Sequence, residues 1–148
     1  MKEIIQLLMA GAGSLGFAIL YNIRGKKLWV IAIGGIAAWG VYLLTQQLTG
    51  NDYASSFTAC VALTLYAEVM AIVFKTPVTV FLVSVAIPLI PGAPLYRAVN
   101  SLMHGSVQEF AREGTYAFLF AASMAAGITL TTLVFRTMRA KRYHRRHL

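Results

Sequence analysis

One acidic residue, Glu68, lies within a long apolar stretch of the sequence, seven residues before Lys75. A carboxylate inside a membrane span costs about 2 to 3 kcal/mol on insertion scales, so such residues usually have a function. In a helix, seven residues correspond to about 10 Å. Glu68 is therefore a candidate to bind a substrate amine, to carry a coupling proton or to pair with a basic residue of another helix. The alternative is a structural pair, or partial snorkelling toward Lys75.

A proline-rich segment follows, in which Pro88, Pro91 and Pro94 are spaced by three residues and Gly92 lies between the last two. Proline removes a backbone donor and disfavours helix at the preceding residue, so we expect the helix to break between Pro88 and Pro94. Backbone groups left unpaired at membrane depth are tolerated only beside protein or a wet cavity, and transporters use such breaks to bind substrates and ions. The segment therefore predicts the lining of a polar path. The alternative is a helix that ends early and turns along the membrane interface.

Three further residues are candidate binding groups. Tyr96 and Arg97 directly follow the break, and the Arg97 guanidinium offers two parallel donors to a carboxylate that arrives from outside. Alternatively, Tyr96 is an interfacial aromatic residue and Arg97 contacts lipid headgroups. Asn22, at the end of the first apolar segment, is a candidate helix cap or binding residue. Motifs for nucleotide binding, hydrolysis and zinc are absent from the sequence, so we expect no cofactor, no metal and no enzyme.

The composition requires membrane helices to position these residues. Of the 148 residues, 58% are apolar and 12% are charged, and the mean hydropathy is +0.67. Soluble domains carry about 25% charged residues. Because the apolar residues fall in long runs, we expect an all-α polytopic membrane protein. This excludes a disulfide scaffold, a disordered tail and a cytosolic enzyme, and the single Cys60 cannot form an intrachain disulfide.

We expect a single membrane domain over residues 1–148, with five transmembrane helices of which the fourth is broken by prolines. A helix crosses about 30 Å of hydrocarbon at about 1.5 Å per residue. Residues 95–114 have apolar positions at helical spacing, so they predict a short amphipathic segment at the outer interface, broken at Gly105. The last helix is expected to begin near residue 107 and to run on through the fifth span. The expected spans are about 4–23, 28–48, 53–74, 77–94 and 115–136.

The net charge of +8 would suit a nucleic-acid-binding protein. The basic residues flank the apolar runs, however, so they indicate membrane topology and we expect no nucleic-acid partner. Five crossings with the N-terminus outside place ten of the 13 Lys and Arg residues on the cytoplasmic side. The C-terminus is then cytoplasmic, and the basic tail, residues 137–148, is expected to lie against anionic membrane lipid. Because the basic residues follow the first apolar run, we expect a true span there rather than a signal peptide.

Small residues spaced by four recur in the expected helices. In lipid such residues let helix backbones approach closely. We expect them to pack the helices of this chain against each other, and a homo-oligomeric contact is the alternative. The pairs are Ala12 and Gly16, Gly34 and Ala38, Ala121 and Ala125, Ala122 and Ala126, and Ser123 and Gly127.

The motifs resemble those of a known family. Residues 76–81 (TPVTVF), continued by 87–92 (IPLIPG) and Tyr96, are similar to the signature of the threonine/serine exporter (ThrE-like) family, in its short C-terminal-half type. The segment 16–18 (GFA) with Asn22, the Gly34-Gly35 helix and Glu68 also resemble the family pattern. The resemblance covers nearly the whole chain and points to Glu68, Pro88, Pro91, Gly92 and Tyr96. Two departures are Arg24, where proline is expected, and Pro94, which adds a third break.

The resemblance implies the small, five-span half of a ten-span secondary exporter in the bacterial plasma membrane. The other half would be a larger polytopic membrane subunit of the same family. It also implies export of threonine and serine, which are small carboxylate metabolites. The alternatives are a subunit that exports a dicarboxylate such as succinate, and an assembly subunit that does not itself transport.

Overall fold

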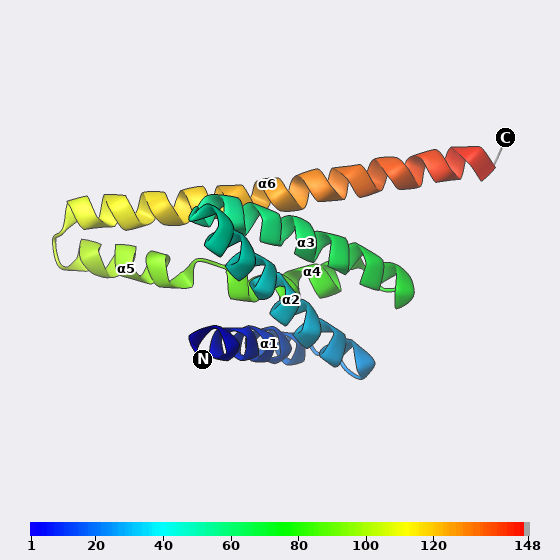
Figure 1. Ribbon diagram of the computed structural model, residues 1–148, viewed down its shortest axis with the longest axis horizontal. Helices are drawn as coiled ribbons and strands as arrows, with labels where there is room; N and C mark the ends of the chain where they lie inside the picture. Colours follow the sequence, from blue (N-terminus) through cyan, green and yellow to red (C-terminus); the bar gives the residue numbers. More distant parts are fainter. Residues whose placement is uncertain (147–148) are drawn as a thin grey trace.

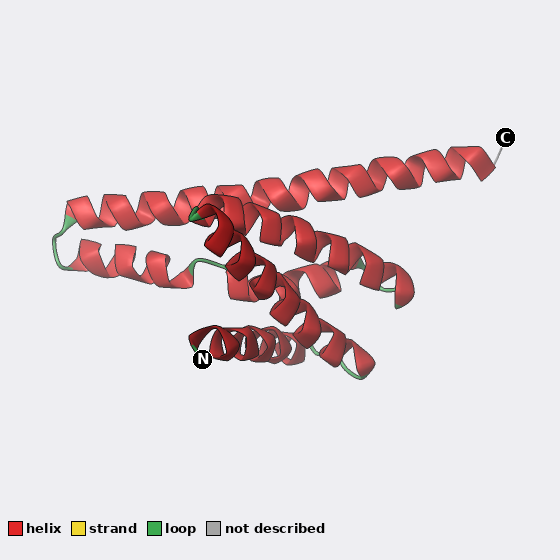
Figure 2. Ribbon diagram, in the orientation of Figure 1, coloured by secondary structure: helices red, strands yellow, loops and turns green. Residues whose placement is uncertain are grey.

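The computed structural model describes residues 1–146, with side chains as far as Met138, and these residues form helices joined by short turns (Figures 1 and 2). Four of the helices are long and apolar enough to cross a membrane, and a bent helix pair makes a fifth span if it counts as one. The expected all-α polytopic membrane fold is thus confirmed. The elements are α1 (Lys2–Leu20), α2 (Lys26–Thr49), α3 (Asp52–Val73), α4 (Val78–Ala86), the 3-10 turn η1 (Ile87–Leu89), α5 (Gly92–Met103) and α6 (Val107–Arg146).

The helices pack in chain order, with one insertion. α1 packs on α2, α2 on α3 and α3 on α6, while α4 and η1 fill the space between α1, α2 and α3. Figure 1 shows α1 and α6 on opposite sides of the molecule. The core lies where α4 meets its neighbours, because Phe81 and Val85 of α4 are fully buried together with Ile31 of α2 and Leu63 of α3.

Glycines allow the closest of these contacts. A Cβ atom on Gly34 would lie 2.5 Å from Cε1 of Tyr66 and 2.9 Å from Cγ2 of Val85. A Cβ atom on Gly127 would lie 2.7 Å from the backbone oxygen of Phe57. Gly34 therefore lets α2 approach α3 and α4, and Gly127 lets α6 approach α3.

Only part of the small-residue pattern packs the chain's own helices. Gly34, Ala38 and Gly127 are buried, and Ser123 is half-buried. The remaining three pairs are exposed, so the expectation of internal packing was wrong for them. The reason is rotation about the helix axis, because these pairs lie on sides of α1 and α6 that no helix of the described residues covers. They are Ala12 and Gly16, Ala121 and Ala125, and Ala122 and Ala126.

The proline-rich segment forms two helices that meet at an angle. Pro88 lies inside η1, and the backbone leaves helical geometry at Ile90 and Pro91. The parts on either side of this bend, Val78–Leu89 and Gly92–Met103, are inclined by 56°. Pro94 lies in the first turn of α5, where its missing N–H is not needed. It therefore helps to start a helix, and the expectation of a third break there was wrong.

Residues 95–114, expected to form a short amphipathic segment broken at Gly105, form a helical hairpin with a turn at Gly105. α5 and the beginning of α6 run antiparallel and are joined at Gly105, which has φ +78°. Figure 1 shows this hairpin extending beyond the ends of α2 and α3. As expected, α6 begins at Val107 and continues without interruption to Arg146. The backbone of the expected basic tail is thus helical as far as Arg146, whereas its side chains after Met138 and residues 147–148 lie outside the described part.

Two residues other than glycine adopt a left-handed backbone at helix ends. Asn22 has φ 57° after α1 and Lys75 has φ 48° after α3. Both close a Schellman motif, in which the N–H of the next residue donates a hydrogen bond back into the last helical turn. Ile23 donates to the carbonyl of Ala18 at 3.0 Å, and Thr76 donates to the carbonyl of Ala71 at 3.1 Å. The Asn22 side chain accepts a hydrogen bond from Arg24 Nε at 3.0 Å. Asn22 therefore ends α1 through its backbone conformation rather than as a side-chain cap.

The left-handed conformation of Lys75 leads to a stability prediction. The left-handed region costs a side-chain-bearing residue about 1 to 2 kcal/mol, and glycine loses about 0.5 to 1 kcal/mol of that advantage through the entropy of the unfolded chain. We expect Lys75→Gly to raise the thermal unfolding midpoint in detergent, with a gain of about 0.5 to 1 kcal/mol. Lys75→Ala removes the same ammonium group but keeps the Cβ atom, so it should give no gain. An equal rise in both variants would assign the effect to charge instead of backbone conformation.

Candidate functional site

Glu68 lies on the buried face of α3, with 4% of its surface exposed. The side chain has an interaction partner inside the protein. The neighbouring turns of this face contain Thr64, Ala67 and Ala71, which are also buried. The buried neighbours of Glu68 on this face of α3 are therefore small.

Counted along their helices, two buried serines lie at about the same depth as Glu68. Ser14 of α1 and Ser84 of α4 are both 0% exposed, and their hydroxyl oxygens have no hydrogen-bond partner among the described residues. Glu68 precedes Lys75 by seven residues and Ser84 follows Pro77 by seven, so each lies about 10 Å from the α3–α4 turn. Helix α1 ends on the same side of the molecule as the α3–α4 turn, and Ser14 lies at a similar distance from that end of α1. We refer to Ser14, Glu68 and Ser84 as the polar layer.

The polar layer depends on close packing of α1 against α2. Gly35 of α2 faces Ser14, and any Cβ atom there would overlap the Ser14 hydroxyl. A buried hydroxyl without a partner costs about 1 to 3 kcal/mol. The hydroxyls of Ser14 and Ser84 therefore carry hydrogen-bonding capacity that water or a small polar solute can satisfy.

A pocket of about 250 Å³ lies one helical turn from the polar layer, toward the proline bend. We call it the bend pocket. Pro88 follows Ser84 by four residues, and Trp39 follows Gly35 by four, so both lie one helical turn from the layer, toward the proline bend. The indole nitrogen of Trp39 is buried and has no hydrogen-bond partner among the described residues. The bend pocket is lined by Gln6, Met9, Ala10, Trp39 and Pro88.

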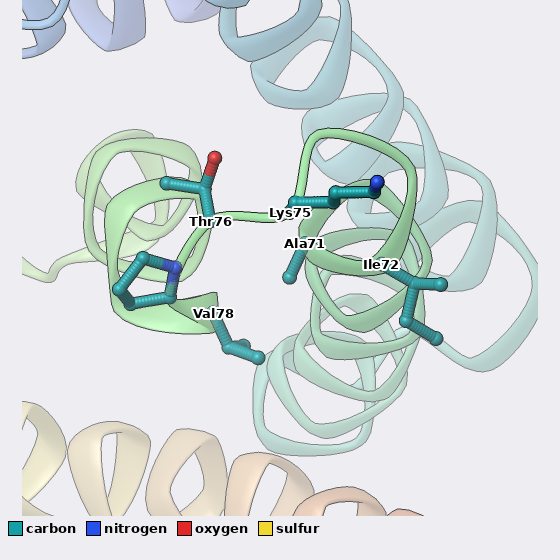
Figure 3. Close-up of a pocket in the computed structure, with 6 residues that line it drawn as sticks. Ala71, Ile72, Lys75, Thr76 and Val78 are labelled. Atoms are coloured by element: carbon teal, nitrogen blue, oxygen red, sulfur yellow. The ribbon is translucent and has the colours of Figure 1, made fainter.

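Another pocket, of about 450 Å³, lies at the turn between α3 and α4 (Figure 3). Figure 3 shows the Lys75 side chain extending over the end of α3, with Thr76 and Val78 on the side of α4. The Thr76 hydroxyl donates a hydrogen bond to the carbonyl of Phe74 at 2.8 Å, which holds the turn before Pro77. The helix that carries Glu68 thus ends in a basic group beside this pocket. The lining residues are Ala71, Ile72, Lys75, Thr76, Pro77 and Val78.

The other candidate residues lie away from the polar layer. Pro91 and Gly92 begin α5, which packs along α6, and Tyr96 is 72% exposed. Arg97 Nε lies 3.1 Å from Glu113 Oε2, so an incoming carboxylate would compete with this ion pair. Asn22 is exposed at the end of α1. Of the candidates, Glu68 and Pro88 are the ones beside buried polar atoms, and a binding role for the others stays a prediction.

α5 presents its polar side to α6 and its apolar side outward. Besides the Arg97–Glu113 pair, Ser101 donates a hydrogen bond to Glu109 at 3.4 Å, and Ala98 between them is buried. The outward side chains are at least half exposed: Leu95, Val99 and Leu102. The amphipathic character read from the sequence is therefore real, but its polar side pairs with another helix.

The sequence reasoning missed a polar cluster at the beginning of α3. The Asp52 carboxylate accepts hydrogen bonds from the hydroxyl of Tyr42 at 3.2 Å and from that of Tyr116 at 2.6 Å. Asn51 Oδ1 caps α3 by accepting from the backbone N–H of Tyr53 at 2.9 Å. Asp52 thus joins α2, α3 and α6 at one point. An Asn-Asp pair before an apolar run signals a helix start, but it does not reveal tyrosine partners on other helices.

Residues 6–134 match the family model described as Threonine/Serine exporter, ThrE, which accounts for most of the chain. No curated protein and no solved structure matches the chain.

Proposed function

Because this chain belongs to the threonine/serine exporter family, we propose that it is a small subunit of a secondary transporter that exports threonine and serine together with a larger polytopic membrane partner. The observation that supports this role most directly is the polar layer, in which Glu68 lies level with two buried serine hydroxyls that have no partner among the described residues. Intramembrane carboxylates and unsatisfied polar groups of this kind mark substrate and ion pathways.

The chemistry of the layer suits a hydroxy amino acid. Its ammonium group can pair with the Glu68 carboxylate, and its hydroxyl can bond with Ser14 or Ser84. A dicarboxylate lacks the ammonium group and would bring two more negative charges toward Glu68, which is unfavourable at low dielectric. The layer therefore favours threonine and serine over succinate.

A larger partner is part of the proposal because this chain offers few polar groups. Apart from the polar layer and the Asp52 cluster, the described faces of the spans are mostly apolar, and the bend pocket and the pocket at the α3–α4 turn are lined largely by apolar side chains. A complete route for a zwitterion needs polar groups across the whole bilayer. In this proposal α4 and α5 form the fourth span, the N-terminus lies outside, and the C-terminus lies in the cytoplasm of a bacterial cell.

The test is export from proteoliposomes. The chain, purified with the larger membrane protein that co-purifies with it, is reconstituted in vesicles loaded with labelled threonine, serine or succinate. We expect the pair to release threonine and serine at least tenfold faster than vesicles that contain either subunit alone, with little effect on succinate. A partner that transports equally well alone would make this chain an assembly subunit. Release no faster than from empty vesicles would contradict the proposed transport function.

A further inference from the structure

A third pocket, of about 380 Å³, lies between the residues that follow α1 and helix α4. We call it the inner pocket, because it lies on the opposite side of the polar layer from the bend pocket. Its volume is within the range of about 300 to 1,000 Å³ that is usual for small-molecule sites. The lining residues are Tyr21, Ile23, Thr79, Val80, Val83 and Ser84.

Ser84 connects the inner pocket to the polar layer. It lines the pocket, it is fully buried, and its hydroxyl has no hydrogen-bond partner among the described residues. A serine hydroxyl is both a donor and an acceptor. A polar group of a bound molecule at this position would satisfy a hydroxyl that the protein itself leaves unpaired.

The opposite end of the inner pocket suits a negative charge. Thr79 lies in the first turn of α4, and Pro77, at the N-cap position, makes no side-chain hydrogen bond to cap this helix. The uncapped N–H groups at a helix N-terminus favour a carboxylate. Thr79 and Ser84 are five residues apart, about 7.5 Å by helical rise. Ile23, Val80 and Val83 form an apolar wall between them.

We propose that the inner pocket is the cytoplasmic loading site of the exported solute, a small carboxylate whose second polar group bonds Ser84. This inference rests on the proposed export function and on its orientation. The solute lies with its carboxylate near the beginning of α4 and its aliphatic part against Val80 and Val83. The bend pocket and the inner pocket then flank the polar layer along the line where α1 meets α4 and η1. In alternating access a central site is reached from one side of the membrane at a time, and the two pockets would be the two routes to the polar layer.

The single buried Cys60 makes a labelling test direct. In a Cys60→Ala background, Val83→Cys places a thiol in the inner pocket, and Val69→Cys places one on α3 outside it. The two valines are 39% and 46% exposed. Each lies six residues from the α3–α4 turn, so their depths match. The assembled pair, in inside-out vesicles, is treated with N-ethylmaleimide with and without threonine.

We expect threonine to slow the labelling of Val83→Cys at least fivefold and to leave Val69→Cys unchanged. Adding Ser84→Ala should raise the threonine concentration that gives half-protection by about fivefold, as for the loss of one hydrogen bond. Absence of protection at Val83→Cys overturns the proposal. Protection of both cysteines also overturns it, because it would reflect a change in the whole protein instead of occupancy. Unchanged half-protection in the Ser84→Ala variant would overturn the role of Ser84.

The labelling and export experiments test the inner pocket and the transport function separately. A pair that exports threonine without protecting Val83→Cys keeps the proposed function and loses this pocket. A pair that exports nothing, but in which threonine protects Val83→Cys alone, keeps the pocket as a binding site and loses the transport function.

Discussion

Glu68→Gln is expected to lower threonine export by the assembled transporter at least tenfold while leaving the protein folded and assembled. The substitution keeps the volume of the side chain and most of its hydrogen-bonding capacity, but it removes the negative charge. Hydrogen bonds to charged groups are worth about 1.5 to 3 kcal/mol, and about 1.4 kcal/mol corresponds to a factor of ten in affinity. A role in binding the substrate ammonium, or in carrying a proton, would therefore be lost in this variant.

The matched control is Glu109→Gln, since Glu109 is exposed at the beginning of α6 and bonds only Ser101 among the interactions described above. This variant should export at the wild-type rate. Export is measured as release of labelled threonine from proteoliposomes, and assembly as co-elution with the larger subunit. Wild-type export by Glu68→Gln would remove Glu68 from the transport mechanism. Loss of co-elution would instead make Glu68 a structural residue.

Gly127→Ala is expected to weaken the packing of α6 on α3 by about 1 to 2 kcal/mol. The added Cβ atom would lie 2.7 Å from the carbonyl oxygen of Phe57 and 3.0 Å from Cβ of Cys60. The Phe57 oxygen belongs to the backbone, so it cannot move away as a flexible side chain would. Overpacking of this kind costs about 1 to 3 kcal/mol, and the better helix propensity of alanine recovers up to about 1 kcal/mol.

Gly114→Ala in the same helix separates the two effects. Among the described residues, no atom outside its own turn of helix lies within 4 Å of a Cβ built on Gly114, so this variant gains the helix propensity without the clash. Thermal unfolding in detergent should show a lower midpoint for Gly127→Ala and an equal or higher midpoint for Gly114→Ala, both relative to the wild type. Shifts of the same sign and size in both variants would show that the approach to Phe57 does not limit stability.

The lengths and limits of the first three helices could be read from the sequence to within a few residues. Each apolar run is bounded by residues that end helices or prefer water, such as Asn22, Gly50 and Lys75, and these signals act locally. The proline segment was harder to interpret. Three prolines at a spacing of three predict a break, yet Pro88 is accommodated in a 3-10 turn and Pro94 in the first turn of α5. The position of the bend therefore depends on where each helical turn begins.

The contacts between distant residues could not be predicted. Glu68 was identifiable as a lone acid in an apolar run, but Ser14 and Ser84 resemble many single serines in membrane helices. Their common depth depends on the packing of four helices, and their burial depends on how far each helix is rotated. Likewise, the partner of Arg97 depends on the turn at Gly105, which brings Glu113 alongside.

The length of α6 has a mechanical consequence. The helix has 40 residues, and Gly127, where a Cβ atom would lie 2.7 Å from the backbone of α3, lies near the middle. About twenty residues extend on each side, so each arm is roughly 30 Å long. If α6 tilts about this contact by about 10°, its two ends move about 5 Å in opposite directions, given arms of roughly 30 Å. A continuous helix that pivots near its middle can thus transmit a displacement on one face of the bilayer to the other face.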